Sequence, residues 1–250
     1  MLHDKARSAL LLIAVFAANF FETWTENSVE RNFLVNSNIG ARCASAFQSM
    51  ETTLTKFDFN NAFDFRGFSA EFIAYSASFA YFFLFPFIAL GIALALARRT
   101  NAVYLRCFAY AIAVNYLISL PFYLFYPIPE RWAFPDSEAV LLSDHISYRL
   151  IEAFRPISAL DNCFPSSHVS ITVILIYVAY NFAMPLKHFV LIVGLAVILS
   201  TYVLGIHWLP DIVAGVALGT VSWYTAVTLL VRRSKRTLMP ASSLSLSSIK

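Results

Sequence analysis

Two short histidine motifs hold the residues of this sequence that are best suited to chemistry. The first reads NCFPSSH and ends at His168, and the second reads GIHWLPD and contains His207 and Asp211. Asp211 follows His207 by four residues, so its carboxylate can reach the imidazole ring if the intervening turn is helical. An aspartate beside a histidine fixes the tautomer of the ring and raises its basicity. The second motif therefore predicts an activated histidine.

The first motif predicts the start of a helix. Pro165 followed by Ser166 is a typical helix N-terminus, and the amide N–H groups of Ser166, Ser167 and His168 would then point outward. Free amides at a helix N-terminus favour an anion. Pro210 similarly suits the first turn of a helix. A single interfacial histidine more often has a structural role, but two such motifs with serine and aspartate at these spacings favour a functional site.

The elements that must position these motifs are membrane helices. Of 250 residues, 59% are apolar and 13% are charged, and the mean hydropathy is +0.66. A soluble domain carries roughly 25% charged residues, so bilayer lipid is the expected solvent. We predict an all-α polytopic membrane protein, a bundle of about six transmembrane helices that forms a single domain over residues 1–236. The predicted spans are residues 8–24, 72–97, 103–125, 168–184, 189–206 and 212–231.

The first span has an alternative interpretation. Its apolar run is short and follows Lys5 and Arg7, which also fits a signal peptide with a cleavage site after Ala17. We favour an uncleaved helix, because aromatic residues up to Trp24 can extend the run to the membrane interface. Either interpretation leaves the N-terminus cytoplasmic.

The positive-inside rule orients the chain. With a cytoplasmic N-terminus and six spans, Arg98 and the basic stretch 232–236 lie on the cytoplasmic side. We therefore predict cytoplasmic N- and C-termini, outer segments at residues 25–71 and 126–167, and a disordered cytoplasmic tail at residues 237–250. Both histidine motifs then lie at helix ends on the non-cytoplasmic side, which is extracytoplasmic or lumenal.

The first outer segment is rich in phenylalanine. Phe57, Phe59, Phe63, Phe65 and Phe68 alternate with polar residues. This pattern fits either a segment that rests on the membrane interface or one that packs against the helical bundle. We favour packing against the bundle, and the sequence leaves both interpretations open.

The two motifs resemble those of the type 2 phosphatidic acid phosphatase superfamily, which also includes vanadium haloperoxidases and bacterial acid phosphatases. That family carries Pro-Ser-Gly-His, where this chain reads Pro-Ser-Ser-His from Pro165 to His168. It also carries Ser-Arg-(five)-His-(three)-Asp, where this chain reads Ser-Thr-(five)-His-(three)-Asp from Ser200 to Asp211. The chain is most similar to the inositol phosphorylceramide synthase branch. The Tyr-Pro-x-x-Pro-Pro-Arg element of that branch is matched in shortened form by Tyr126 to Arg131. The resemblance covers residues 103–231 and implies a helical phosphatase-like core.

Two departures from the family pattern matter for phosphate binding. Thr201 replaces the arginine of the second motif, so one phosphate-binding guanidinium is missing. The Lys-(six)-Arg-Pro element is also absent, because Arg155 and Pro156 are present but Tyr148 stands where the lysine would be. A phosphate dianion needs several donors. We therefore expect Arg131 and Arg155 to compensate.

The resemblance implies covalent catalysis by the motif residues. His207 is the expected nucleophile, Asp211 its orienting partner, and His168 the general acid and base. Four further residues are expected to hold the phosphate oxygens: Ser166, Ser167, Arg131 and Arg155. No metal ion and no cofactor are expected, because no carboxylate cluster accompanies the histidines.

The expected activity is that of a membrane-embedded phosphatase or phosphotransferase acting on a lipid phosphate or lipid diphosphate. Its expected partners are this substrate and the membrane lipids, and no nucleic acid. The main alternative is headgroup transfer between lipids, as in the inositol phosphorylceramide synthases. A more distant alternative is a transporter or a non-catalytic membrane protein. Transporters usually place ionisable groups near the bilayer midplane, whereas the predicted spans hold almost none.

Overall fold

The computed structural model describes residues 2–25, 39–55, 68–137, 139–142 and 163–238 of the chain, and every regular element in these residues is helical. The longer elements are α1 (Leu2–Thr25), α2 (Ile39–Thr55), α4 (Phe68–Phe79), α5 (Phe85–Arg98), α6 (Ala102–Phe125), α8 (Ser167–Asn181), α9 (Lys187–Val203) and α10 (Leu209–Leu238). A π-helical segment, η3 (Ala80–Leu84), joins α4 to α5, and two short 3₁₀ turns, η4 (Arg131–Ala133) and η5 (Pro135–Ser137), follow α6. The all-α prediction is confirmed.

Most of the predicted spans are present as membrane-length helices. Within the described residues, four helices are long and apolar enough to cross a bilayer: His3–Trp24, Glu71–Arg98, Ala102–Phe125 and Leu209–Leu230. Helices α8 and α9 are also apolar, but they have 15 and 17 residues, fewer than the roughly 20 that span a bilayer. The chain is therefore a helical membrane protein, and the number of six spans stays a prediction.

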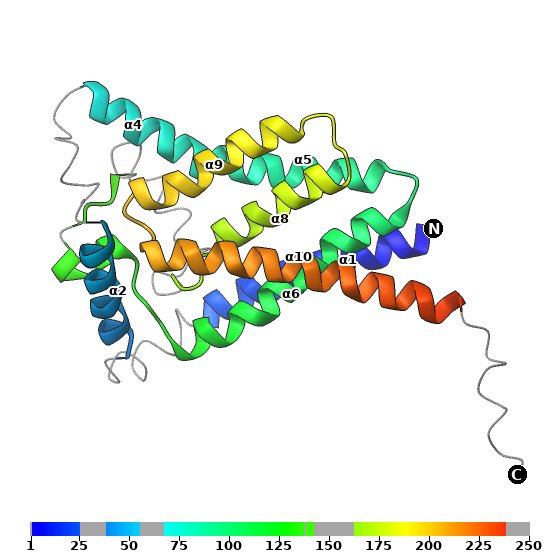
Figure 1. Cartoon of the computed structure of the whole chain (residues 1–250), viewed down its shortest axis with the longest axis horizontal. Coiled ribbons are helices and arrows are strands. Elements are labelled where there is room, and N and C mark those ends of the chain that lie inside the picture. Colours follow the sequence, from blue (N-terminus) through cyan, green and yellow to red (C-terminus); the bar gives the residue numbers. More distant parts are fainter. Residues whose placement is uncertain (1, 26–38, 56–67, 138, 143–162, 239–250) are drawn as a thin grey trace, which may run out of the picture.

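The helices lie side by side, so that the molecule has two distinct ends (Figure 1). The chain's N-terminus and the links α5–α6 and α8–α9 lie at one end, which carries Arg98, Arg99 and Lys187 and is called the basic end below. The starts of α8 and α10 and the ends of α6 and α9 lie at the opposite end, called the motif end. Both histidine motifs therefore lie at the same end of the bundle, as the sequence predicts.

The first predicted span packs within this bundle. Helix α1 runs alongside α6. At the basic end Lys5 donates a hydrogen bond to the carbonyl of Ala97, and Asp4 forms an ion pair of 2.8 Å with Arg106. These contacts hold α1 against α5 and α6.

Helices α8 and α10 approach each other closely, because two glycines of α10 face α8. A Cβ atom at Gly219 would lie 2.4 Å from the carbonyl oxygen of Ser170, and one at Gly215 would lie 2.8 Å from that of Ser166. Small residues four apart let membrane helices pack backbone against backbone. Since α8 begins in the first histidine motif and α10 begins in the second, this contact sets the distance between the two motifs.

The interior between α5, α6, α8, α9 and α10 is apolar and tightly packed. Leu96, Ile174, Val178 and Val197 are fully buried there. Large apolar side chains such as Phe87 cover the outside of the bundle. An apolar outer surface is expected where lipid, rather than water, surrounds the helices.

The outer segments contain structure that the sequence did not predict. Helix α2 (Ile39–Thr55) crosses the motif end and contacts α10 (Figure 1). The phenylalanine-rich stretch from Phe57 onward lies almost entirely outside the described residues, so the two interpretations of it stay open. Helix α10 continues to Leu238, and the predicted tail beyond it also lies outside the described residues.

Candidate active site

The first motif forms a capped helix start. Ser166 is the N-cap of α8, and its hydroxyl accepts a hydrogen bond of 3.4 Å from the amide of Val169. The buried hydroxyl of Tyr123 donates to the carbonyl of Pro165 over 2.9 Å and fixes the turn before the helix. The predicted helix start is therefore confirmed.

One expectation for this motif is wrong. The amide of Ser166 donates to the carbonyl of Asp211 over 3.3 Å, so it is not available to an anion. The amides of Ser167 and His168 lie in the first turn of α8, where helix geometry offers no partner within the helix. The bond from Ser166 instead ties the first motif directly to the second.

A glycine turn positions the second motif. Gly205 follows the end of α9 with a φ of +75°, a conformation that other residues rarely adopt. A Cβ atom there would also lie 2.8 Å from the carbonyl oxygen of Val140. After this turn, the amide of His207 donates to the carbonyl of Thr201 over 3.0 Å. The hydroxyl of Thr201 donates within its own helix to Ile198 over 2.7 Å, so it does not replace the missing guanidinium.

The carboxylate of Asp211 reaches the ring of His207, as the spacing predicts. Asp211 Oδ2 lies 3.5 Å from His207 Nδ1 and also accepts the amide of Trp208 over 2.8 Å. Asp211 is fully buried, and His207 is 5% exposed. With Nδ1 directed to the carboxylate, Nε2 is the ring nitrogen left for chemistry.

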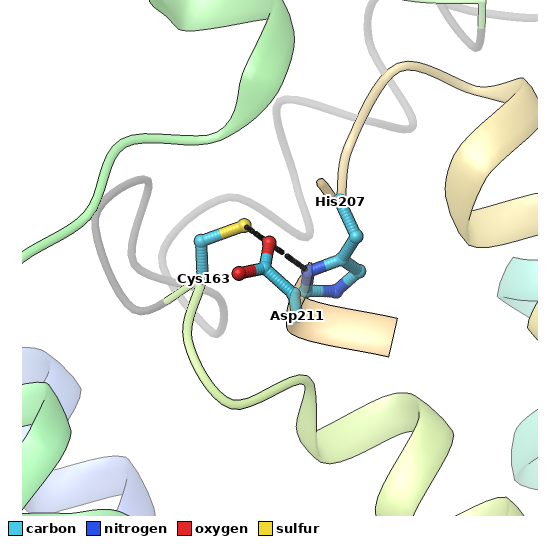
Figure 2. A group of neighbouring side chains, drawn as sticks. All are labelled: Cys163, His207 and Asp211. Atoms are coloured by element: carbon cyan, nitrogen blue, oxygen red, sulfur yellow. Dashed lines mark hydrogen bonds and ion pairs between the residues drawn. The ribbon is translucent and has the colours of Figure 1, made fainter. Parts of the chain in front are cut away.

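Cys163 completes a buried group around this pair (Figure 2). Its Sγ donates to Asp211 Oδ2 over 2.8 Å and lies 3.1 Å from His207 Nδ1. Burial, and then the negative charge of Asp211, raise the pKa of the Cys163 thiol well above its usual range. The thiol is therefore a neutral hydrogen-bond donor to the carboxylate. A thiol, an imidazole and a carboxylate this close are also a donor set for a metal ion.

A tyrosine from a distant helix holds the other histidine. The hydroxyl of Tyr81 lies 3.1 Å from His168 Nδ1, and the two rings stack with their centroids 4.3 Å apart. Phe85 contacts the same imidazole, at 4.9 Å between centroids. Tyr81 belongs to the π-helical segment η3, and such segments occur often at functional sites.

The two motif histidines meet in space. The centroids of the rings of His168 and His207 are 6.3 Å apart, and the ring planes are inclined by 54°. Each ring has its Nδ1 engaged, by Tyr81 in one case and by Asp211 and Cys163 in the other. The Nε2 atoms of both rings are thus the atoms available to a molecule bound between them.

Arg131 lies beside the second motif but has an acidic partner. Its amide donates to the carbonyl of Ile206 over 3.1 Å, next to His207. Its buried guanidinium lies 3.3 Å from Glu51 Oε2 and 4.9 Å above the ring of Tyr202. Glu51 Oε1 also accepts the amide of Leu209 at the start of α10. Arg155, the second predicted phosphate ligand, lies outside the described residues.

Sequence reasoning missed three residues of this site. Tyr81 lies in a continuous apolar run, where nothing in its neighbours marks it. Glu51 lies in an outer segment for which no helix was predicted. Cys163 stands inside the first motif, and its place two residues before Pro165 was the one available signal.

One comparison with known proteins gives a match. A family model described as the PAP2 superfamily matches residues 104–235, more than half of the chain. No curated protein and no solved structure matches the chain. The matched segment contains both histidine motifs and Arg131, whereas Tyr81 and Glu51 lie before it.

Proposed function

Because this chain belongs to the PAP2 superfamily, whose members are generally phosphatase-type enzymes, we propose that it transfers the phosphoryl group of a lipid phosphate or lipid diphosphate through a phosphohistidine at His207. The observation that carries the proposal is the meeting of the two motif histidines. Their rings lie 6.3 Å apart, each held at Nδ1 by a separate partner. One phosphoryl group bound between the rings can contact both Nε2 atoms.

In the first step, His207 Nε2 attacks phosphorus while the bond to the leaving oxygen breaks. Asp211 stabilises the positive charge that develops on the ring, since its carboxylate lies 3.5 Å from Nδ1. His168 donates its Nε2 proton to the leaving oxygen. Tyr81 acts as a positioning residue, because its hydroxyl oxygen can accept the Nδ1 proton of the charged ring and so leaves Nε2 to face the leaving oxygen.

In the second step, the acceptor oxygen attacks phosphorus and the bond to His207 breaks. His168, now neutral, takes the proton of the acceptor and is ready for the next cycle. The acceptor is water in a phosphatase and a hydroxyl group in a phosphotransferase. Asp211 keeps its role as the partner of the His207 ring in both steps.

The phosphate oxygens are held by the start of α8. The amides of Ser167 and His168 lie at the positive end of the helix dipole. Ser166 supports this turn as its N-cap and is fully buried. Arg131 supplies a guanidinium in place of the family arginine that Thr201 replaces, and it shares its charge with Glu51.

The length of α8 supports a lipid substrate. A helix of 15 residues such as α8 is about 23 Å long, shorter than the roughly 30 Å hydrocarbon layer. If its other end lies at the opposite interface, His168 sits below the membrane surface. A phosphate attached to an acyl or isoprenoid chain can enter from the bilayer, so a lipid is favoured over a soluble phosphate ester.

Headgroup transfer between two lipids is the second candidate. It is favoured by the element from Tyr126 to Arg131, which resembles that of the inositol phosphorylceramide synthases. In the structure, this element contacts both motifs, because Ile128 accepts the amide of Cys163 and Arg131 donates to Ile206. A headgroup acceptor bound along this segment would lie next to the phosphohistidine.

The site is proposed to face the non-cytoplasmic side, with both chain termini cytoplasmic. The basis is the positive-inside rule applied to the basic end of the bundle. A cysteine placed at Asp136, in η5, should react with a membrane-impermeant thiol reagent in intact cells, and one placed at Arg99 should not. Both are introduced into a chain with Cys43→Ser. The opposite labelling would overturn the proposed side of the membrane.

The test of the function uses the purified full chain in detergent. It is incubated with lipid monophosphates and lipid diphosphates, with and without an alcohol acceptor, while inorganic phosphate and lipid products are measured together. We expect phosphate release or transfer in the wild type and none in His207→Ala. His188→Ala serves as the matched control at the basic end. An absence of both products with every lipid tested would overturn the proposal.

A further inference from the structure

Three different metal-ligand atoms meet where the two motifs touch, one from the first motif and two from the second (Figure 2). Cys163 Sγ lies 3.1 Å from His207 Nδ1 and 2.8 Å from Asp211 Oδ2, and the last two atoms are 3.5 Å apart. All three side chains are buried. Around a tetrahedral Zn²⁺, ligand atoms at about 2.0–2.3 Å from the metal are roughly 3.3–3.7 Å from one another. The distance from His207 Nδ1 to Asp211 Oδ2 already fits, and the two distances from Cys163 Sγ need to lengthen by roughly 0.4–0.7 Å to hold such an ion.

The second oxygen of Asp211 adds an independent observation. Asp211 Oδ1 is buried and has no hydrogen-bond partner within the described part of the chain. A buried carboxylate oxygen without a donor is costly. A cation bound at this carboxylate removes that cost, and the Trp208 amide already holds the other oxygen in place.

The charges of the group also favour a divalent cation. A thiolate from Cys163 and the carboxylate of Asp211 together carry two negative charges, which one divalent ion cancels. A neutral buried centre avoids the cost of an unpaired charge. The thiol and imidazole select borderline-soft ions such as Zn²⁺ and Cd²⁺, because Mg²⁺ and Ca²⁺ prefer oxygen ligands.

We propose that Cys163, His207 and Asp211 form an inhibitory site for zinc-class divalent cations. The cation binds Cys163 Sγ with loss of the thiol proton to solvent, His207 Nδ1 with transfer of the ring proton to Nε2, and an oxygen of Asp211. A fourth position is left for water. The inhibition, but not the binding, rests on the proposed function.

Inhibition follows from the atoms that the metal occupies. A cation on Nδ1 leaves the proton of the neutral His207 ring on Nε2, which then has no electron pair with which to attack phosphorus. It also takes the carboxylate of Asp211 away from the imidazolium that must form during phosphoryl transfer. Removal of the metal by a chelator restores both groups.

Binding is tested on the purified full chain without substrate. Cd²⁺ is the spectroscopic probe, since cadmium bound to a thiolate gives an ultraviolet absorption band, and equilibrium dialysis with Zn²⁺ gives stoichiometry and affinity. We expect one Zn²⁺ per chain and a cadmium–thiolate band. Cys163→Ser should lose the band and bind Zn²⁺ at least roughly 100-fold more weakly. Loss of an outer-shell partner costs roughly 10–100-fold in metal affinity, and loss of a direct ligand should cost at least as much.

Two other cysteines provide matched controls. Cys107 is buried in α6 and Cys43 is half-buried in α2, and both are free thiols. Cys107→Ala and Cys43→Ala should keep the cadmium band and the zinc affinity. Zinc should also raise the melting temperature of the wild type and not that of Cys163→Ser. A band that persists in Cys163→Ser, or its absence from the wild type, would overturn the site.

Phosphate release from a lipid phosphate then separates the two proposals. Each variant is measured with and without Zn²⁺ and compared with its own metal-free rate. Zinc inhibition that a chelator reverses, and that needs at least roughly 100-fold more metal in Cys163→Ser, supports the inhibitory role. Zinc binding without inhibition of an active enzyme overturns that role. A metal-free wild type without activity overturns the proposed function, while the binding result stands by itself.

Discussion

The two ends of the bundle contain the same pair of side chains in different settings. At the motif end the hydroxyl of Tyr81 lies 3.1 Å from His168 Nδ1, and at the basic end that of Tyr180 lies 3.1 Å from His188 Nδ1. Tyr81 is 7% exposed and stacks on its histidine with centroids 4.3 Å apart, whereas Tyr180 is 37% exposed and meets its histidine edge-on at 5.8 Å. The same hydrogen bond therefore fixes a half-buried histidine at one end and an exposed histidine at the other.

Two arginines, one at each end of the bundle, show the same contrast. Arg131 at the motif end and Arg99 at the basic end each lie over a tyrosine ring, at 4.9 and 4.8 Å. Arg99 donates to the carbonyl of Phe182 over 2.8 Å and so caps the C-terminus of α8. Arg131 instead faces Glu51 beside the second motif. Residue pairs alone thus do not identify the site, which requires a helix N-terminus and a second histidine nearby.

The largest contrast is expected between the two histidines with tyrosine partners. His168→Ala should lower the rate of phosphate release by roughly 10²–10⁴, because the leaving oxygen loses its proton donor. His188→Ala should leave the rate unchanged. The deficit of His168→Ala should shrink with a nitrophenyl phosphate, whose leaving group departs without protonation. Equal rates for both variants would remove His168 from the mechanism.

The two arginines should differ next. Arg131→Ala should lower kcat by roughly 10²–10³, the effect of losing one donor to the transition state. Arg99→Ala should change activity by no more than the effect of a surface charge, roughly 0–1 kcal/mol. Thermal unfolding of both variants and of Arg131→Lys separates lost folding from lost chemistry. Mild and equal effects on activity would show that the phosphate lies elsewhere.

The tyrosines give the smallest contrast. Tyr81→Phe removes one hydrogen bond, about 1 kcal/mol, and should lower kcat about five- to tenfold with KM unchanged. The pH profile of kcat should shift, because the protonation of His168 is no longer held by the hydroxyl. Tyr180→Phe should change neither quantity. A Tyr81→Phe enzyme with a normal pH profile would reduce Tyr81 to a packing role.

Contacts that are local in the chain could be predicted from the sequence. The pair His207 and Asp211 depends on a single helical turn, and the N-cap at Ser166 depends on its own neighbours. The meeting of both motifs at one end followed from counting apolar runs. These features need only the helix period and the span length.

Contacts between distant segments could not be predicted in the same way. The bond between Tyr81 and His168 joins residues 87 positions apart and depends on a π-helical segment within an apolar run. The ion pair of Glu51 with Arg131 depends on α2, whose modest apolar content gives no span signal. The amide of Ser166 was expected to be free and instead binds Asp211, because α8 and α10 approach so closely.

The most direct test of the central claim is to trap the phosphoryl group on the protein. The enzyme is mixed with a ³²P-labelled lipid phosphate and quenched in alkali, because phosphohistidine is acid-labile, and the labelled peptide is identified. The wild type and His168→Ala should both carry label on His207, and His207→Ala should carry none, while His188→Ala behaves as the wild type. Label in His207→Ala together with none in His168→Ala would mean that the roles of the two histidines are reversed.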